Sequence, residues 1–137
     1  VMLADRDENR LHEEVENYQS EEGSARIFSC DLRERLSQAN LLSATIDAFD
    51  RVDILVNASR QVLSTDPLDI EDDSVEILLQ QNLMSSMRLS QLIAKRMIKQ
   101  GAVSVDGEKV TDENLDLNGC QEYLIKVGKK RFLKIVP

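Results

Sequence analysis

The chain has 137 residues, about the size of one ordinary domain and enough to bury a single core. Apolar residues make up 42% of it and charged residues 31%, a globular composition that argues against disorder. Its apolar runs are far shorter than a membrane span, and no basic segment precedes an apolar one near the first residue, so we expect a soluble, cytoplasmic protein without a targeting signal or membrane partner.

The net charge of −8 is unevenly distributed along the chain. Residues 95–137 contain nine Lys or Arg against six Asp or Glu, so this segment carries +3 and the remainder carries −11. A basic tail can indicate binding to a polyanion, whereas a solvated charged surface is the commoner cause, and both interpretations stay open.

The residues that commonly bind metals show no metal-binding pattern. Cys30 and Cys120 have no CxxC spacing and no nearby His, which favours reduced structural thiols. His12 lies in a run of Glu residues typical of a solvated helix face. Five acids between residues 66 and 73 lack the spacing of a calcium loop. We therefore expect no metal site.

The first hundred residues alternate between strand and helix patterns. Short apolar runs at 1–5, 24–31 and 52–58 predict strands, and the last is continuously apolar, as in a strand buried on both faces of a parallel sheet. Apolar residues at helical spacing follow each run. Three strand–helix units predict an α/β fold with right-handed crossovers. The expected helices, with a stop at Gly23, an N-cap at Ser74 and a C-cap at Gly101, cover 6–23, 32–50 and 75–100.

The pattern changes period after Gly101. "GAVSVDGEKV" alternates around Asp106-Gly107, which is the strongest short hairpin signal. "EYLIKVGKKRFLKIV" predicts two more strands around Val127-Gly128-Lys129. No linker rich in Ser, Gly or Pro separates the two parts, so we expect segments 1–100 and 101–137 to share one compact domain.

Residues 1–100 carry four motifs in a specific order: "VMLADRD", "CDL", "DILVNAS" and "QNLMSSMRLSQLIAKRMIKQ". In this order they resemble a short-chain dehydrogenase/reductase. The resemblance implies a three-layer, Rossmann-like partial parallel sheet, which the C-terminal hairpins would join or extend.

The same resemblance suggests cofactor-binding residues. Asp5 can accept hydrogen bonds from a ribose 2′-OH, which favours NAD over NADP. By resemblance, Asp31 would touch the adenine, Asn57 would lie under the cofactor and Asn82 would assist a proton relay. The alternative is structural: the two Asp residues are helix-entry acids, and the two Asn residues satisfy backbone groups at a sheet edge.

The chain also departs from the dehydrogenase pattern. The first strand and glycine-rich turn of the family would precede Val1, and the later strand with the catalytic Ser and the Tyr-x-x-x-Lys pair has no counterpart. Tyr123 and Lys126 are only three residues apart in a predicted strand. We therefore expect no enzymatic activity and no cofactor, and we interpret the four candidate residues as vestigial.

Residues from about 94 onward, "AKRMIKQGAVSVDGEKVTDENL" and then "LIKVGKKRFLKIV", resemble the C-terminal RNA-binding module of bacterial tyrosyl-tRNA synthetases. The usual first helix of that module is replaced here by dehydrogenase-like sequence. Phosphate contacts give affinity without sequence information. By resemblance, the residues that would contact RNA phosphates are Lys95, Arg96, Lys99, Lys129, Lys130 and Arg131.

We therefore interpret the protein as a non-catalytic, recombined or designed chimera. A weak, nonspecific RNA-binding protein and a vestigial nucleotide-binding domain are the alternatives. In the dehydrogenase strand order 3-2-1-4-5, the absent first strand would leave a gap beside the strand at 1–5. We expect residues 131–136 to fill it, between the strands at 1–5 and 52–58, within the molecule or by exchange in a homodimer.

Overall fold

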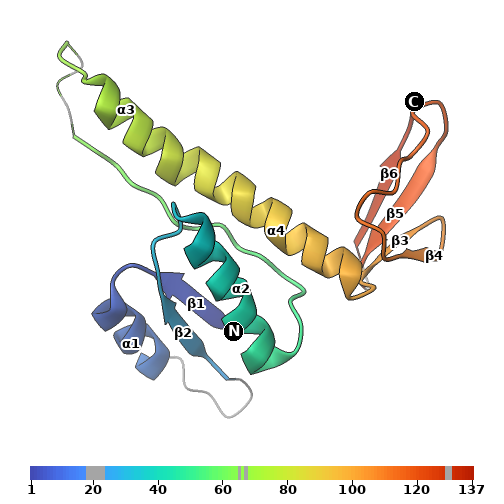
Figure 1. Ribbon diagram of the computed structural model, residues 1–137, viewed down its shortest axis with the longest axis horizontal. Coiled ribbons are helices and arrows are strands. Elements are labelled where there is room, and N and C mark those ends of the chain that lie inside the picture. Colours follow the sequence, from blue (N-terminus) through green and yellow to red (C-terminus); the bar gives the residue numbers. More distant parts are fainter. Residues whose placement is uncertain (18–23, 65, 67, 129–130) are drawn as a thin grey trace. The chain divides into compact units, whose positions relative to one another are not determined.

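The computed structural model describes residues 1–17, 24–64, 66, 68–128 and 131–137 (Figure 1). The chain divides into two compact units: one comprises Val1–Asp50 and Val56–Ser90, the other Arg51–Leu55 and Gln91–Pro137. In chain order the elements are β1 (Met2–Asp5), α1 (Glu8–Asn17), β2 (Arg26–Ser29), α2 (Arg35–Phe49), α3 (Asp72–Leu79), the π-helical turn η1 (Gln80–Met84), α4 (Ser85–Lys99), β3 (Val103–Val105), β4 (Glu108–Val110), β5 (Tyr123–Val127) and β6 (Arg131–Ile135).

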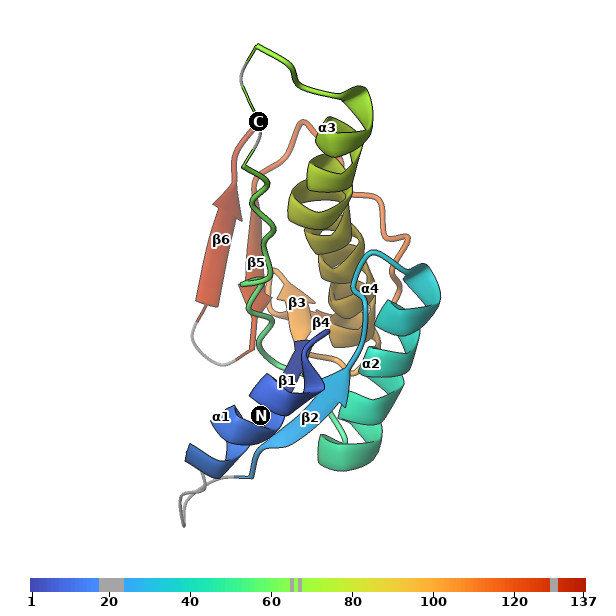
Figure 2. The ribbon, with the colours of Figure 1, turned by 90° about the vertical axis from the view of Figure 1, so that its left-hand side faces the viewer.

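The first unit is built around a parallel pair of strands. β1 and β2 pair in register, with Leu3 opposite Ile27. α1 covers one side of this pair and α2 the other (Figure 2). Leu11 of α1 and Leu41 of α2 are buried, as expected of helices that cover the apolar side chains of a sheet. The α/β class expected from the sequence is confirmed.

The prediction of a strand at residues 52–58 is wrong. The structure describes all seven residues, and they form an extended loop without strand pairing. Val52 is buried, but Ile54 is 65% exposed and Val56 is 77% exposed. An apolar run indicates a preference for burial, whereas a strand also needs a neighbouring strand to satisfy its backbone groups. In the described part of the chain, this run has no such neighbour.

The long helical segment begins earlier than expected. Glu71 is the N-cap residue of α3, and the backbone N–H of Ser74 donates to the carbonyl of Glu71, so Ser74 lies inside the first turn and is not the N-cap. Asp72 and Asp73 occupy that turn, where negative charge is favourable next to the helix N-terminus. Among the described residues, no helix has the length and apolar character needed to cross a membrane.

The end of α4 confirms the prediction of Gly101 as a cap. Gly101 has a positive φ of 71°, which glycine adopts without steric cost. Its N–H donates to the carbonyl of Ile98, and the N–H of Ala102 donates to that of Met97, the pair of bonds that defines a Schellman motif. The expected stop at Gly23 lies outside the described residues.

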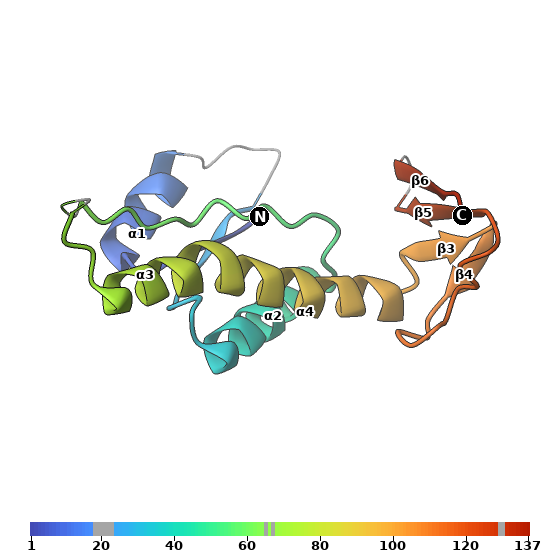
Figure 3. The same cartoon turned by 90° about the horizontal axis from the view of Figure 1, so that it is seen from above.

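The second unit contains an antiparallel sheet of order β4-β3-β5-β6 (Figure 3). Both hairpins predicted from the sequence are confirmed. Asp106 and Gly107 have φ values of 50° and 91°, as a two-residue hairpin turn with positive φ at both positions requires. Gly128 follows β5 with a φ of 65°. The turn chemistry therefore fixes the strand pairing locally.

The expected insertion of residues 131–136 into the parallel sheet is wrong. β6 pairs antiparallel with β5, with Leu133 opposite Ile125, and Leu133 and Ile135 are 60% and 37% exposed. β3 likewise pairs with β4 and β5 and does not extend the β1–β2 pair. Short hairpin loops are closed at much lower entropic cost than a long-range insertion, so the local pairing wins. The domain boundaries at 1–100 and 101–137 stay predictions.

Candidate functional site

A cavity of about 280 Å³ lies at the carboxyl ends of β1 and β2. Ligands of open α/β sheets bind outside the carboxyl ends of their strands, which makes this cavity the candidate site of the first unit. Its lining mixes both signs of charge. Three arginines and two carboxylates contribute: Arg6, Arg10, Arg60, Asp5 and Asp7.

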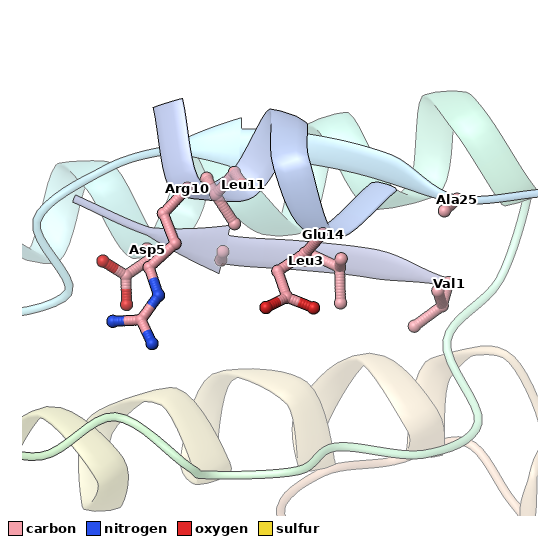
Figure 4. A pocket seen from close by; sticks show the side chains of 8 residues that line it. Val1, Leu3, Asp5, Arg10, Leu11, Glu14 and Ala25 are labelled. Carbon is pink, nitrogen blue, oxygen red and sulfur yellow. The ribbon is translucent and has the colours of Figure 1, made fainter. Parts of the chain in front are cut away.

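A second cavity, of about 520 Å³, lies between β1 and α1 (Figure 4). Val1, Leu3 and Leu11 give it apolar walls. The side chains of Asp5 and Arg10 lie next to each other at one end of this cavity and also line the smaller one. The two cavities therefore share a charged boundary at the end of β1.

Asp5 and Asp7 shape the entry into α1. The carboxylate Oδ1 of Asp5 accepts a hydrogen bond from the backbone N–H of Asp7 at 3.0 Å. Oδ1 of Asp7 in turn accepts one from the N–H of Arg10 at 3.1 Å, which satisfies a free donor of the first helical turn. Asp5 thus has a structural role in the strand–helix turn, although it also lines the cavity.

Asp31 is held by its own neighbour after β2. Nε of Arg33 donates to both carboxylate oxygens of Asp31 at 3.0 Å, and the backbone N–H of Arg33 donates to Oδ1 at 2.9 Å. These hydrogen bonds, led by the one from the Arg33 side chain, lower the pKa of Asp31. The carboxylate expected to touch an adenine is therefore already engaged by a guanidinium.

Cys30 directly precedes this ion pair and lines the smaller cavity. Burial raises the pKa of the Cys30 thiol, and the negative charges of Asp31 and Asp5 raise it further. Since the thiolate is the reactive form, Cys30 is a poor nucleophile at neutral pH.

The two asparagines expected to contact a cofactor make different contacts. Asn57 is exposed, and its Nδ2 donates to Oγ of Ser90 at 3.0 Å. Asn82 lies in the π-helical turn η1 and bonds to the backbone of Gln61. Such turns widen a helix locally and often occur at functional sites. Neither asparagine lines the smaller cavity, which the described residues Asp5, Cys30 and Gln81 do line.

The candidate RNA-binding cations lie in the second unit. Lys95 and Lys99 are on the last turns of α4, and their ammonium groups lie 4.0 Å and 3.6 Å from the carboxylate of Glu113. Arg96, which lies between these two lysines in the sequence, is half-buried, and Arg131 is exposed at the start of β6. Lys129 and Lys130 lie outside the described residues. The structure therefore brings Lys95 and Lys99 together around one carboxylate.

Other cations of this unit have partners of their own. Nζ of Lys134 lies 2.8 Å from the carboxylate of Glu122, and Nζ of Lys126 lies 5.4 Å from the centroid of the Phe132 ring. Such contacts reduce the positive charge available to a polyanion.

Sequence reasoning did not find the polar residues that organise the first unit. Gln38 of α2 is 2% exposed, and its Nε2 donates to the carbonyls of Leu32 at 2.6 Å and Ser85 at 3.1 Å. A glutamine on a helix gives no signal of this role. The cavity arginines were missed as well, although Arg6, which directly follows Asp5 at the end of a predicted strand, offered a positional signal.

Known proteins resemble the two parts of the chain separately. A family model for short chain dehydrogenases matches residues 1–105. The solved structure of a 7α-hydroxysteroid dehydrogenase complexed with NADH and 7-oxo glycochenodeoxycholic acid superposes with a TM-score of 0.67 at 28% identity, over 74% of this chain and 39% of that one.

The C-terminal half is similar to tyrosine–tRNA ligases. The Desulfotalea psychrophila protein is 60% identical over 42 residues, 31% of this chain and 10% of the relative. The Bdellovibrio bacteriovorus protein is 40% identical over 77 residues, 51% of this chain and 19% of the relative.

The chain thus spans less than half the length of each of these relatives. Both family resemblances expected from the sequence are confirmed, and their arrangement is consistent with a chimera. Because the family model covers most of the residues, the chain belongs to the short-chain dehydrogenase family.

Proposed function

We propose that the chain is a non-catalytic chimera whose second unit binds RNA weakly, through contacts to phosphates. The observation that carries this proposal is the pair of cations at the end of α4, in a segment similar to tyrosine–tRNA ligases. Lys95 and Lys99 are 59% and 60% exposed, one helical turn apart, so one RNA phosphate can meet both ammonium groups.

The absence of catalysis is supported by the hairpin sheet that succeeds α4. In this sheet Tyr123 and Lys126 both lie on β5. Side chains three residues apart on a strand point to opposite faces of the sheet, so these two cannot act as a Tyr–Lys pair on one substrate. The Tyr123 hydroxyl accepts from the N–H of Asn118 at 2.9 Å and contacts the side chain of Gln121, so it already has two partners.

Electrostatics supports weak affinity. The segment from residue 95 carries +3, whereas the remainder carries −11, and that charge repels a polyanion over distances within the Debye length. Phosphate contacts also carry no sequence information. Dissociation constants in the nonspecific range, roughly 10⁻⁴ to 10⁻⁶ M, are expected at physiological salt.

Titration of the full chain with unfractionated tRNA at several salt concentrations tests this function. The logarithm of the affinity should fall linearly with the logarithm of the salt concentration, because phosphate binding releases counterions. Double replacement of Lys95 and Lys99 by Gln should weaken binding and flatten this dependence. Lys109→Gln, an exposed cation on β4, is the control. An affinity that does not change with salt concentration, or binding that is tight and sequence-selective, would contradict the proposal.

Nucleotide binding at the smaller cavity is the second candidate function. The three arginines that line it favour a phosphate group. The site fits a dinucleotide only in part, because Asp31, expected to touch its adenine, is bound to Arg33 outside the cavity lining, and the Asp5 carboxylate serves the turn into α1. The favoured ligand is therefore a mononucleotide.

Titration with AMP, followed by amide chemical shifts, tests this second function. Shifts should concentrate at the ends of β1 and β2 and vanish in Arg60→Ala. Arg35→Ala, which removes an exposed arginine outside the cavity lining, should leave them in place. Equal effects of the two substitutions would count against a site in this cavity.

A further inference from the structure

Glu113 holds an unusual position between two lysines. Its carboxylate Oε2 lies 3.6 Å from Nζ of Lys99 and 4.0 Å from Nζ of Lys95. The Glu113 side chain is 24% exposed, whereas the lysine side chains are 59% and 60% exposed. Both cations therefore reach toward one shielded oxygen from one face of α4.

The shielded oxygen is poorly satisfied. Oε2 of Glu113 is buried, and no hydrogen bond to it is found among the described residues. The separations from the two ammonium groups exceed ordinary charge-assisted hydrogen bonds of about 2.7–2.9 Å. Such a carboxylate gains attraction from the two charges but little directional bonding, so a stronger anion can replace it without breaking a hydrogen bond.

We infer that Lys95, Lys99 and Glu113 form one site for a single RNA phosphate, in which the Glu113 carboxylate occupies the phosphate position in the free protein. RNA binds there by displacing Glu113 from the two ammonium groups. This inference rests on the proposed RNA-binding function and adds that the Glu113 carboxylate competes with the RNA phosphate for the two lysines. Glu113 thereby lowers the affinity of the protein for RNA.

The amount by which Glu113 lowers the affinity for RNA depends on how exposed its ion pairs with Lys95 and Lys99 are. Exposed ion pairs contribute about 0.2–1 kcal/mol each, which corresponds to about two- to fivefold in affinity near the upper end. The phosphate contact is the same whether RNA displaces the Glu113 carboxylate or a glutamine amide, so the slope of the salt dependence should stay unchanged.

A charge-matched pair of variants tests the inference in the full chain. Glu113→Gln removes the competing charge and keeps the shape of the side chain. Glu108→Gln removes an exposed charge from β4 and alters the net charge by the same amount. We expect Glu113→Gln to bind tRNA about two- to fivefold more tightly at low salt, with the slope of the salt dependence unchanged, and Glu108→Gln to change the affinity much less. Equal changes in the two variants would overturn the inference.

A second probe separates this inference from the function on which it rests. Inorganic phosphate is titrated into each variant while the side-chain signals of Lys95 and Lys99 are followed by NMR. If no variant binds tRNA, the proposed function fails. The site itself is supported if phosphate shifts the lysine signals at lower concentration in Glu113→Gln than in Glu108→Gln, and it is rejected if the two variants respond alike.

Discussion

The side-chain amide of Asn82 bonds to both backbone polar groups of Gln61. Oδ1 of Asn82 accepts from the N–H of Gln61 at 2.7 Å, and Nδ2 donates to its carbonyl at 2.9 Å. The amide thereby replaces the backbone partner that a strand neighbour would supply. The loop that continues from residues 52–58 is fastened in this way to the π-helical turn.

Replacement of Asn82 by Ala should destabilise the first unit. Two solvent-accessible hydrogen bonds are lost, at roughly 0.5–1.5 kcal/mol each as an upper range, so we expect a loss of about 1 kcal/mol in the free energy of unfolding. Urea denaturation measures it. Asn57→Ala, which removes the single bond to Ser90, is the control and should cost less. An Asn82→Ala protein as stable as the parent would show that this contact is energetically neutral.

The purified chain should not oxidise NADH in the presence of any carbonyl substrate. The reason is the placement of Tyr123 and Lys126 on opposite faces of β5, so the Lys126 ammonium does not lie beside the Tyr123 hydroxyl. Absorbance of NADH over time is the measurement. Oxidation that depends on the protein and disappears in Asn82→Ala would overturn the expectation.

The Asp31–Arg33 pair should make stability depend on pH in the acid range. Because the Arg33 side chain lowers the pKa of Asp31, the pair stabilises the fold above the ordinary Asp pKa of about 3.9, and this contribution is lost as the pH falls through the lowered value.

Arg33→Ala should raise the pKa of Asp31 toward its ordinary range and weaken this dependence. NMR titration of the carboxyl carbon measures the pKa. Arg51→Ala, which breaks the comparable pair with Asp53, is the matched control and should leave Asp31 unaffected.

Charge placed on β6 should leave the first unit folded. Leu133 is 60% exposed on an edge strand, so Leu133→Asp buries no charge, whereas Ile125 is half-buried on β5 between two strands. We expect Ile125→Asp to melt the antiparallel sheet and Leu133→Asp to cost it at most about 1 kcal/mol. Amide shifts of β1 and β2 report the first unit. Their collapse in Leu133→Asp would restore the hypothesis of strand insertion.

The sequence predicts the parts of the fold that depend on local geometry. Gly101, Asp106 and Gly107 adopt positive φ, a requirement carried by single residues, and the cap and the hairpin turn appear where expected. Helix boundaries were less accurate, since Glu71 instead of Ser74 caps α3. Several residues can cap one helix start, so local propensity leaves the choice open.

The features that depend on contacts between separate elements could not be predicted from the sequence in the same way. In the helix expected at 32–50, which is α2, Leu36 is 73% exposed, whereas Leu41 is buried. The inner face of a helix depends on what packs against it, which its own periodicity does not fix. The cavity and the Glu113 contact likewise join residues from separate elements, and sequence spacing gives no distance between them.

The Asp106-Gly107 turn also bears on the timing of folding. The positive φ values of Asp106 and Gly107 set the conformation of a two-residue loop that joins β3 to β4 directly. Hairpins of this kind form in about 1–10 μs. β1 and β2 pair in parallel, so a crossover that includes α1 must be closed before their register is found. We expect the amide protons of the hairpin to gain protection from exchange first, so that β3 and β4 reach native pairing before β1 and β2 do.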